Sequence, residues 1–551
     1  MKLASELLRG TLAAELENGS DSLSSDAEQI IKHHGAYLQD NRDLRRSGTR
    51  QHSFLVRTRL PGGKLTGAQF RAEIDLCDEL GDGTLRITDR QGLQLHGILK
   101  SDLRETIRRI DAVKMTTLGA CGDVVRNVMC CPAPLHDSPV RSEMQSHADA
   151  LARHFALRTR AYYDIWLKTE EENERVGGAP DDEPVYGAAY LPRKFKFALA
   201  LPDDNCVDAL THDVGFVALP GSEANRHFNV YVGGGMGVTP ARTDTFPAVA
   251  QPLARISADA LIPLAHAIVQ VQKEFGNRSD RKRARLKYLI AEWGIERFRE
   301  MLNRVYGKST SPAEDIPIVG LQDHLGWNRQ GGRNWFLGLS VASGRIKDDG
   351  AVKLKSALRA VTQAYPISIR LTPLQDILLC DIPEESREDI EKVLRAFGVL
   401  PGMEIDPVRR LAIACPALPT CGLAITESER ALPALLDSLH SLMQELGLGD
   451  ERLSLRMTGC PNGCTRPYVA EIGIVGKAVG RYTLFLRGSQ SGTRLALRFR
   501  ESQTPEEILA TLRPILREFA GSRLPGESFG YFCNRLGTVG LAAIDSPTVL
   551  S

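Results

Sequence analysis

The sequence predicts an α+β chain, organised as a pseudo-two-fold repeat of strand–helix–strand modules with two larger mixed α/β domains. Three observations support this class: a length of 551 residues, short sequence matches that recur at a nearly constant offset, and alternating apolar strands that end in glycine turns. A chain of this length should form several domains, each with its own core.

Three pairs of matching segments reveal the repeat, and they differ little in offset. The pairs are 54–59 with 336–341 at an offset of 282, 85–88 with 369–372 at 284, and 131–133 with 415–417 at 284. In the first pair an alternating strand runs into a glycine turn in both copies. The strand–helix–strand unit is therefore expected twice.

The two copies differ at three basic positions. Arg57, Arg59 and Arg90 of the first copy correspond to Leu339, Val341 and Leu374 of the second. Residues two apart on a strand share a face, so Arg57 and Arg59 are expected to point the same way. Because the fold accepts apolar residues there, we expect the first copy to line an anion-binding cavity. A face in water is the alternative, since arginine is usually exposed.

Four cysteines near the C-terminus form the most specific pattern. Cys415 and Cys421 are spaced C-x5-C, and after a gap of 38 residues Cys460 and Cys464 are spaced C-x3-C. Four thiolates commonly hold a cubane iron–sulfur cluster, which implies electron transfer. Zinc also accepts four thiolates, although its knuckles favour tighter C-x2-C pairs. Burial of reduced cysteines as small apolar residues is the third interpretation.

Other basic residues of the first half stand in short motifs. Arg126 precedes Asn127, Arg281 lies in a basic run, and Lys194 and Lys196 share one face of a strand that enters an apolar stretch. Two lysines in that position favour an anion to meet them. No Walker, flavin or nicotinamide fingerprint is present, so electrons for any redox reaction would come from another protein.

Bulk composition limits the partners. The chain is 42% hydrophobic and 25% charged with a net charge of +1, which gives no global electrostatic case for nucleic acid or an anionic membrane. No apolar run approaches the roughly 18 residues needed to span a bilayer, and the N-terminus lacks a signal core. We therefore expect a cytoplasmic protein with mostly reduced cysteines.

Together these motifs resemble the nitrite and sulfite reductase family, most closely its NADPH-dependent assimilatory sulfite reductase hemoprotein (beta) subunits. The resemblance spans nearly the whole chain, and its most specific motif is Thr-Gly-Cys-Pro-Asn-Gly-Cys at 458–464. The other motifs that carry it are 57–63, 86–91, 126–128 and 191–196. In one departure, Thr465 follows Cys464 where the family often has glycine.

The resemblance implies two cofactors, siroheme and one [4Fe–4S] cluster. The cluster would be bound by Cys415, Cys421, Cys460 and Cys464, and Cys464 would also be the axial ligand of the siroheme iron. The residues expected to bind siroheme are Arg86, Arg90, Gln94, His96, Asn127 and Arg281. Those expected to act on substrate are Arg57, Arg126, Lys194 and Lys196.

Five segments follow from the resemblance. They are an N-terminal arm (1–50), a first ferredoxin-like half-domain (51–118), a siroheme and substrate-binding domain (119–325), a second ferredoxin-like half-domain (326–400) and an iron–sulfur and siroheme-binding domain (401–551).

The implied reaction is the six-electron reduction of sulfite to hydrogen sulfide, in sulfate assimilation and cysteine biosynthesis. A siroheme-dependent nitrite reductase and a non-catalytic iron–sulfur electron carrier are the alternatives. Nitrite reductases typically have asparagine where this chain has Lys196, which favours sulfite. The expected electron donor is a flavoprotein alpha subunit carrying FAD, FMN and the NADPH site, with ferredoxin as the alternative. Cys130 and Cys131 are expected to pack in the core.

Overall fold

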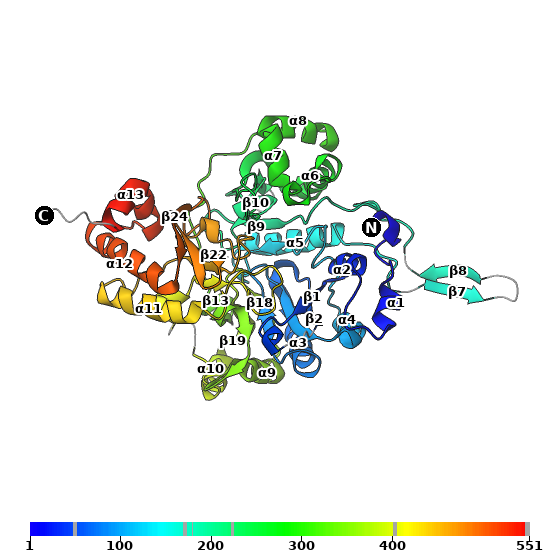
Figure 1. Ribbon diagram of the computed structural model, residues 1–551, viewed down its shortest axis with the longest axis horizontal. Helices are drawn as coiled ribbons and strands as arrows, with labels where there is room; N and C mark the ends of the chain where they lie inside the picture. Colours follow the sequence, from blue (N-terminus) through cyan, green and yellow to red (C-terminus); the bar gives the residue numbers. More distant parts are fainter. Residues whose placement is uncertain are drawn as a thin grey trace.

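Four five-stranded sheets form the framework of the part of the chain that the structure describes (Figure 1). The computed structural model describes residues 1–47, 52–162, 164–168, 173–178, 180–221, 225–400 and 405–545. A hairpin of β7 (Asp164–Lys168) and β8 (Asn173–Gly178) projects from the body, and β16 (Asp348–Asp349) pairs with β17 (Val352–Lys353). Within these ranges we find no helix with the length and apolar character that a membrane span requires.

The first two sheets exchange an edge strand. Their strand orders are β1-β2-β5-β4-β15 and β13-β14-β19-β18-β3. The first sheet comprises β1 (Ala36–Asp40), β2 (His52–Arg57), β5 (Leu93–Ile98), β4 (Leu85–Ile87) and β15 (Arg345–Ile346). The second comprises β13 (Gly326–Gly331), β14 (Asn334–Leu339), β19 (Ile377–Pro383), β18 (Ser368–Leu371) and β3 (Lys64–Thr66).

This exchange binds the two copies of the repeat to each other. Ile346 of β15 pairs with Leu85 of β4, and Leu65 of β3 pairs with Ile369 of β18. Each half therefore completes the other's sheet through backbone hydrogen bonds, which neither could satisfy alone.

One helix follows the exchanged strand in each half. Helix α3 (Gly67–Glu79) begins with a capping box between Thr66 and Gln69, and it contacts α9 (Leu354–Ala364) of the other half. Helices α4 (Leu103–Ala112) and α10 (Arg387–Ala396) follow the last strand of each half.

The third and fourth sheets share one topology. Their strand orders are β6-β9-β10-β11-β12 and β20-β21-β22-β23-β24. In each sheet the first three strands are parallel, the fourth is antiparallel to the third, and the fifth is antiparallel to the fourth. The third sheet comprises β6 (Met129–Cys130), β9 (Phe197–Ala200), β10 (Val214–Ala218), β11 (His227–Val232) and β12 (Gln251–Ser257). The fourth comprises β20 (Ile413–Ala414), β21 (Leu455–Thr458), β22 (Ile472–Ala478), β23 (Arg481–Leu486) and β24 (Leu497–Gln503).

The duplication therefore extends beyond the small modules. Strand β6 is followed directly by Cys131 and β20 directly by Cys415, the two positions that the sequence matches at an offset of 284. A short Cys-Pro-Ala match was the only sequence trace of this larger repeat.

Different helices cover the two larger sheets. Figure 1 shows α6 to α8 gathered beside the third sheet and α11 to α13 beside the fourth. The first set, with α5, has bounds Pro139–His154 (α5), Leu261–Phe275 (α6), Leu286–Trp293 (α7) and Ile295–Tyr306 (α8). The second has bounds Leu432–Glu445 (α11), Pro505–Ser522 (α12) and Phe529–Asp545 (α13). The N-terminal segment adds α1 (Leu12–Glu17) and α2 (Ser25–Ile31).

The apolar core divides in the same way. One continuous cluster joins the first three sheets, and a second fills the space between the fourth sheet and its helices. The mixture of helices and sheets agrees with the predicted α+β class. The expected boundaries at 50/51 and 400/401 fall at or beside residues outside the described ranges, so the five-segment division stays a prediction.

Candidate functional site

The four cysteines lie on two loops that leave neighbouring parallel strands. Cys415 follows β20 and Cys460 follows β21 by one residue, and parallel neighbours end at the same edge of a sheet. The thiols are close enough to act on one another. Burial, with smaller contributions from the charges of Cys421 and Cys460, raises the pKa of Cys415 to about 11.

The backbone around these thiols is tightly packed. The N–H of Gly459 donates to the Cys415 Sγ at 3.4 Å, and Asn462 Nδ2 donates to the Cys460 Sγ at 3.5 Å. A Cβ on Gly459 would lie 2.5 Å from the Thr426 carbonyl oxygen, so only glycine fits there. Such N–H donors stabilise thiolates and tune the reduction potential of a metal cluster that the thiolates bind.

Arg42 supports the first cysteine loop from a distant part of the sequence. Its Nη2 donates to the carbonyl oxygens of Cys421 and Ala424, the latter at 3.0 Å. Its positive charge also counteracts the rise in the pKa of Cys460, for which burial is the main cause. Arg42 carried no predicted role, because nothing local in the sequence connects it with a loop 379 residues away.

Cys464 differs from the other three cysteines because it is exposed, whereas Cys415 and Cys460 are buried. Even so, enough protein surrounds its thiol for burial to raise its pKa, with the charges of Cys415 and Cys460 as the next causes. Burial by itself would lower the pKa values of both Arg57 and Lys194, and the charge of Cys464 is a smaller contribution that raises both, so this thiol interacts electrostatically with two of the predicted substrate residues.

Lys194 and Lys196 stand on either side of the buried Phe195, just before β9. Burial, with smaller contributions from neighbouring arginines, Arg193 first, lowers the pKa of Lys194 to about 7. Burial also lowers the pKa of Lys196 well below its ordinary value, followed by Arg90 and Lys194. Within the described ranges, neither ammonium group makes an ion pair or a hydrogen bond with protein. Half-buried cations without partners are costly, so an anion is expected here.

Arg57 lies at the end of β2 among polar and aromatic neighbours. Its Nη1 donates to the Cys121 Sγ at 3.4 Å, and its guanidinium lies 5.9 Å from the centre of the Tyr37 ring. When the Gln94 amide is oriented with its oxygen toward Arg57, it accepts from the Arg57 Nε at 2.7 Å. A predicted substrate residue and a predicted siroheme residue are thus adjacent. Arg57 is half-buried, whereas Arg59 is buried.

Arg126 is held by backbone carbonyl groups. Its Nε donates to the Gly122 oxygen at 2.8 Å and its Nη1 to the Ala120 oxygen at 2.9 Å. These bonds fix the guanidinium and still leave Nη2 as a donor.

Three of the predicted siroheme residues retain binding capacity. The Arg90 Nη2 donates to the Asn127 carbonyl oxygen at 2.5 Å, and the Asn127 Nδ2 donates to the Arg90 oxygen at 2.8 Å. The buried atoms Asn127 Oδ1 and His96 Nε2 have no hydrogen-bond partner in the described structure. Burial lowers the pKa of Arg90 to about 9. Buried polar atoms without partners indicate a missing ligand or water.

Two more of the predicted siroheme residues, Arg86 and Arg281, are paired with carboxylates. Arg86 is ion-paired with Glu429 and donates to the Ala414 oxygen at 2.7 Å. Arg281 makes a bidentate pair with Asp123, at 2.6 and 3.0 Å. Through its contacts with Glu429 and Ala414, Arg86 connects β4 to the two ends of the first cysteine loop. The Arg281 side chain is 50% exposed, which leaves it able to contact a second anion.

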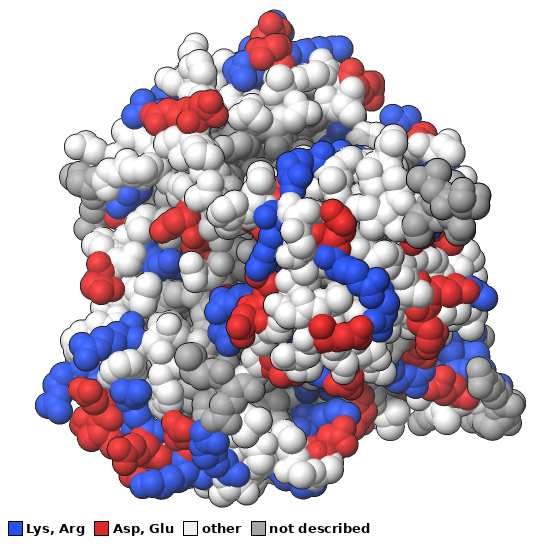
Figure 2. All heavy atoms as spheres, turned by 90° about the vertical axis from the view of Figure 1, so that its left-hand side faces the viewer, with Lys and Arg blue, Asp and Glu red and all other residues white. Residues whose placement is uncertain are grey.

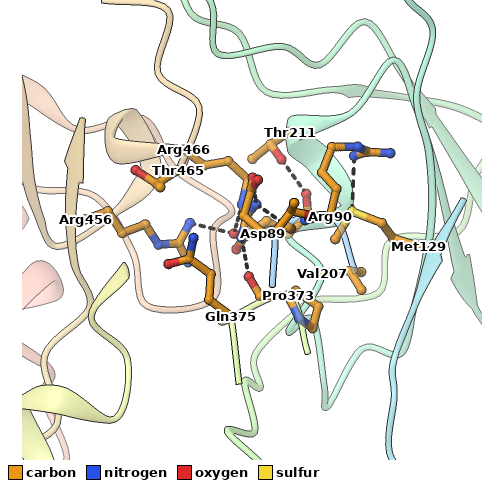
Figure 3. A network of polar contacts seen from close by, with 12 residues as sticks. Asp89, Arg90, Met129, Val207, Thr211, Pro373, Gln375, Arg456, Thr465 and Arg466 are labelled. Carbon is orange, nitrogen blue, oxygen red and sulfur yellow. Dashed lines mark hydrogen bonds and ion pairs between the residues drawn. The ribbon is translucent and has the colours of Figure 1, made fainter. Parts of the chain in front are cut away.

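A buried ion network joins the parts of the molecule beside Cys464 (Figure 3). Asp208 accepts from the Arg456 Nη1 at 2.5 Å and from the Arg466 Nε at 2.6 Å. Arg466 also bonds to the Asp89 carboxylate at 2.7 Å and to the Pro373 oxygen at 3.1 Å. One side chain, two residues beyond Cys464, thus holds segments from both halves. The network was not predicted from the sequence.

Thr465, the departure from the family pattern, fits its position. Its buried hydroxyl donates to the Met457 oxygen at 3.0 Å on β21. Because this hydrogen bond satisfies the hydroxyl, threonine can occupy a buried position where the family often has glycine.

On the face beside α11 to α13, acidic and basic side chains are interspersed, as Figure 2 shows for the described residues. This pattern agrees with the net charge of +1.

Comparison with known proteins identifies the relatives of this chain. Residues 121–310 match the model "Nitrite and sulphite reductase 4Fe-4S domain", and residues 47–113 and 328–397 match "Nitrite/Sulfite reductase ferredoxin-like half domain". The first match covers the third sheet and not the four cysteines. The shared topology of the third and fourth sheets explains how the two regions form one repeated architecture.

Relatives with similarity along the whole chain carry two kinds of name. The chain is 44% identical to a "Sulfite reductase [ferredoxin]" of Synechococcus elongatus, covering 98% of this chain and 89% of the relative. It is 43% identical to a "Sulfite reductase [NADPH] hemoprotein beta-component" of Chromohalobacter salexigens, covering 98% and 95%. A protein with the latter name from Geobacillus kaustophilus is 42% identical, with the same coverage.

A solved structure has the same overall fold. The Mycobacterium tuberculosis NirA protein aligns with a TM-score of 0.79 and 25% identity, over 98% of this chain and 95% of that one. This likeness and the half-domain matches confirm the predicted fold class. Identity above 40% over 98% of the chain, together with both domain matches, shows that this chain belongs to the nitrite and sulfite reductase family.

Proposed function

We propose that this chain is the hemoprotein component of an assimilatory sulfite reductase. It reduces sulfite to hydrogen sulfide with six electrons and supplies reduced sulfur for cysteine biosynthesis. Its cofactors are siroheme and one [4Fe–4S] cluster. The observation that carries the proposal is the electrostatic interaction of Arg57 and Lys194 with Cys464, the thiol expected to bind both cofactors.

The donor set fits these cofactors. Four mutually interacting thiols can hold the cluster, with Cys464 placed to serve the siroheme iron as well. Siroheme carries several carboxylates, which Arg90, Asn127 and Arg281 can meet. The unpartnered His96 Nε2 and Asn127 Oδ1 are suited to further polar contacts. When bound, the two groups accept electrons singly and deliver them to the substrate.

The protein's own side chains bind and protonate the substrate. Arg57 and Arg126 keep their charge and orient the anionic oxygens of sulfite. Lys194 and Lys196 add positive charge where oxygen leaves as water. Because the pKa of Lys194 is about 7, its ammonium group can give up a proton near neutral pH. Proton delivery therefore falls to the lysines and not to the arginines.

Sulfite is favoured over nitrite by Lys196. A second ammonium group suits the larger and more highly charged anion. The test is turnover by anaerobically purified protein with reduced methyl viologen as electron donor. We expect sulfite to be consumed at least about tenfold faster than nitrite at equal concentrations, roughly the effect of one favourable charge contact. Faster nitrite consumption would overturn the substrate assignment, and no turnover of either would overturn the enzyme assignment.

We propose a flavoprotein alpha subunit carrying FAD, FMN and the NADPH site as the electron donor, with ferredoxin as the second candidate. Two of the cited relatives are named as NADPH-dependent and one as ferredoxin-dependent, at similar identity. Reconstitution with each purified donor at equal electron supply tests this. Higher turnover with the flavoprotein supports the proposal, and turnover with ferredoxin alone contradicts it.

A further inference from the structure

A second group of metal-ligating side chains lies outside the proposed reductase site. Cys131, Asp204, Cys206 and His324 place one donor atom each within 4.8 Å of one another. Cys131, Asp204 and Cys206 are almost fully buried, each at 1% exposure, and the His324 side chain is 7% exposed. None of the four belongs to the residues assigned above to substrate, siroheme or the iron–sulfur cluster.

The four residues come from three separate segments. Cys131 follows β6, Asp204 and Cys206 lie in the loop after β9, and His324 precedes β13. Because β6 and β9 are parallel neighbours, their following loops meet at one edge of the third sheet. The fold thus brings residues up to 193 positions apart to one point.

The donor atoms have the spacing of ligands around a single ion. The Cys131 Sγ lies 3.0 Å from the Asp204 Oδ2 and 3.5 Å from the His324 Nε2, which lies 3.2 Å from the same carboxylate oxygen. Zinc–ligand bonds of about 2.0–2.3 Å in a tetrahedron put neighbouring ligand atoms roughly 3.3–3.8 Å apart. The observed spacing is close to this and needs only a slight expansion.

Charge balance also fits a divalent ion. Two thiolates, one carboxylate and a neutral imidazole around a dication leave one net negative charge. Arg141 supplies the balancing positive charge, since its Nη1 contacts the Cys131 Sγ and lies 2.9 Å from the Asp204 Oδ2. The other carboxylate oxygen, Oδ1, accepts from the backbone N–H of Gln322 at 3.2 Å. In metal sites, hydrogen bonds and ion pairs of this kind orient the side chains that bind the ion directly.

The internal duplication gives independent support. Cys131 is the counterpart of Cys415 in the repeat, at an offset of 284 residues and directly after the equivalent strand. In the second copy this position is the first of the four cluster cysteines. The loop after this strand is therefore a place where the scaffold can hold a metal-binding thiolate, and only the first copy adds Asp204, Cys206 and His324 around it.

We propose that Cys131, Cys206, His324 and Asp204 bind a structural zinc ion. The mixed set of two sulfurs, one nitrogen and one oxygen suits zinc in a closed tetrahedral site, which leaves no open position for catalysis. The alternative is a metal-free cluster in which Arg141 and a protonated His324 neutralise Asp204 and one thiolate.

The ion would fasten the linker that leads into the second half of the chain. The backbone already holds this linker against the loop after β9: Val319 N–H donates to the Pro202 oxygen at 2.8 Å, and Asn205 N–H donates to the Gly320 oxygen at 2.9 Å. Zinc would add His324 to this attachment and fix the approach of β13 to the third sheet.

The test is the metal content of the full chain, produced with both cofactors and purified without chelators. We expect about one zinc per chain alongside about five irons, four from the cluster and one from siroheme. Cys206→Ser should lower the zinc content about tenfold and leave the iron unchanged, as loss of a ligand does. Cys380→Ser, at another buried cysteine, is the matched control and should keep its zinc.

X-ray absorption at the zinc edge of the wild-type protein decides the matter even if a variant misfolds. We expect about two sulfur neighbours near 2.3 Å and two nitrogen or oxygen neighbours near 2.0 Å. A shell of four sulfurs would place the zinc at the cluster cysteines and overturn the proposal. Fully iron-loaded protein without zinc, or zinc retained in Cys206→Ser, would overturn it as well. None of these readouts depends on sulfite turnover.

Discussion

At the scale of single residues, the proposed site depends on two half-buried lysines that make no ion pair or hydrogen bond with the part of the chain that the structure describes. Lys194 and Lys196 approach the site from a strand whose next residues are wholly apolar and buried. Their depressed pKa values follow from burial and from neighbouring arginines. A sulfite anion would relieve both effects, so binding energy and proton supply come from the same groups.

The pH dependence of turnover should report Lys194. Since its pKa is lowered to about 7, the ammonium form prevails below neutrality and is lost as the pH rises. We expect kcat/KM to fall above about pH 7 in the wild type. Lys194→Arg keeps its charge, so its activity should be lower overall but should lose this limb. Both enzymes meet the same substrate, and the ratio of their pH profiles therefore isolates Lys194. A constant ratio would show that Lys194 does not supply the proton.

Lys196→Asn tests the choice between anions. Removing the second ammonium group should lower kcat/KM for sulfite by about 10- to 100-fold, or roughly 1.4–3 kcal/mol. Nitrite turnover should fall much less, because nitrite carries less negative charge than sulfite. Lys273→Asn, at a lysine that donates to the Val185 oxygen at 3.2 Å, is the control. Equal losses for both anions would argue against a selective role.

At the scale of elements, loop ends of parallel strands position the chemistry, and helices of the small modules support it. Helix α3 contains one unfavourably placed side chain. Glu73 is fully buried, and neither of its carboxyl oxygens has a hydrogen-bond partner in the described structure. Burial raises the pKa of this carboxyl from 4.5 to about 8. The folded protein therefore keeps it protonated at neutral pH, whereas the unfolded chain ionises it.

Glu73→Gln should change how stability depends on pH. Between about pH 4.5 and 8 the native state binds one proton more than the unfolded state, so this residue makes stability fall as the pH rises. Glutamine has no such proton, and the variant's advantage should grow by about 1.4 kcal/mol per pH unit in this window. Melting curves at pH 5.5 and 7.5 measure it. Glu79→Gln, at an exposed residue of the same helix, is the control, and a constant gap between Glu73→Gln and wild type would refute the account.

The sequence could predict these elements where the evidence is local. Alternating apolar residues and glycine turns located the strands of both small modules, and cysteine spacing singled out two loops that the structure brings to one edge of the fourth sheet. The exchange of β3 and β15 could not be predicted, because pairing partners are chosen by packing and leave no mark in either strand. The same holds for Arg42 and Arg466, whose roles depend on loops that are distant in the sequence.

At the scale of the whole molecule, we propose that two copies of one scaffold are combined into one site. The first copy would contribute Arg57, Arg126, Lys194 and Lys196, and the second would contribute the four cysteines. The sequence suggests this division through the differences between copies, and the division stays a prediction. The sequence did not show that the larger sheets repeat too, because only Cys-Pro-Ala survives of that similarity.

Asp208→Asn tests how the parts are held together. Asp208 is fully buried between Arg456 and Arg466, and Arg466 reaches both small modules. Removing its charge leaves two buried guanidinium groups without their carboxylate, so we expect a loss of about 3–5 kcal/mol in unfolding free energy. Asp182→Asn breaks an exposed pair with Arg158 at 3.7 Å and should cost less than about 1 kcal/mol. Equal effects in denaturant unfolding would contradict the proposed importance of the network.

The duplicated scaffold has one purpose in this account, which is to bring cations of one copy to the cofactor-bearing thiol of the other. Sulfite turnover and siroheme absorption of Cys464→Ser, produced with the cofactor's biosynthetic enzymes, test this most directly. Cys533→Ser, at a buried cysteine of the same region, serves as the control. We predict that Cys464→Ser folds but loses sulfite turnover, whereas Cys533→Ser retains it. Wild-type turnover and siroheme absorption in Cys464→Ser would contradict the account.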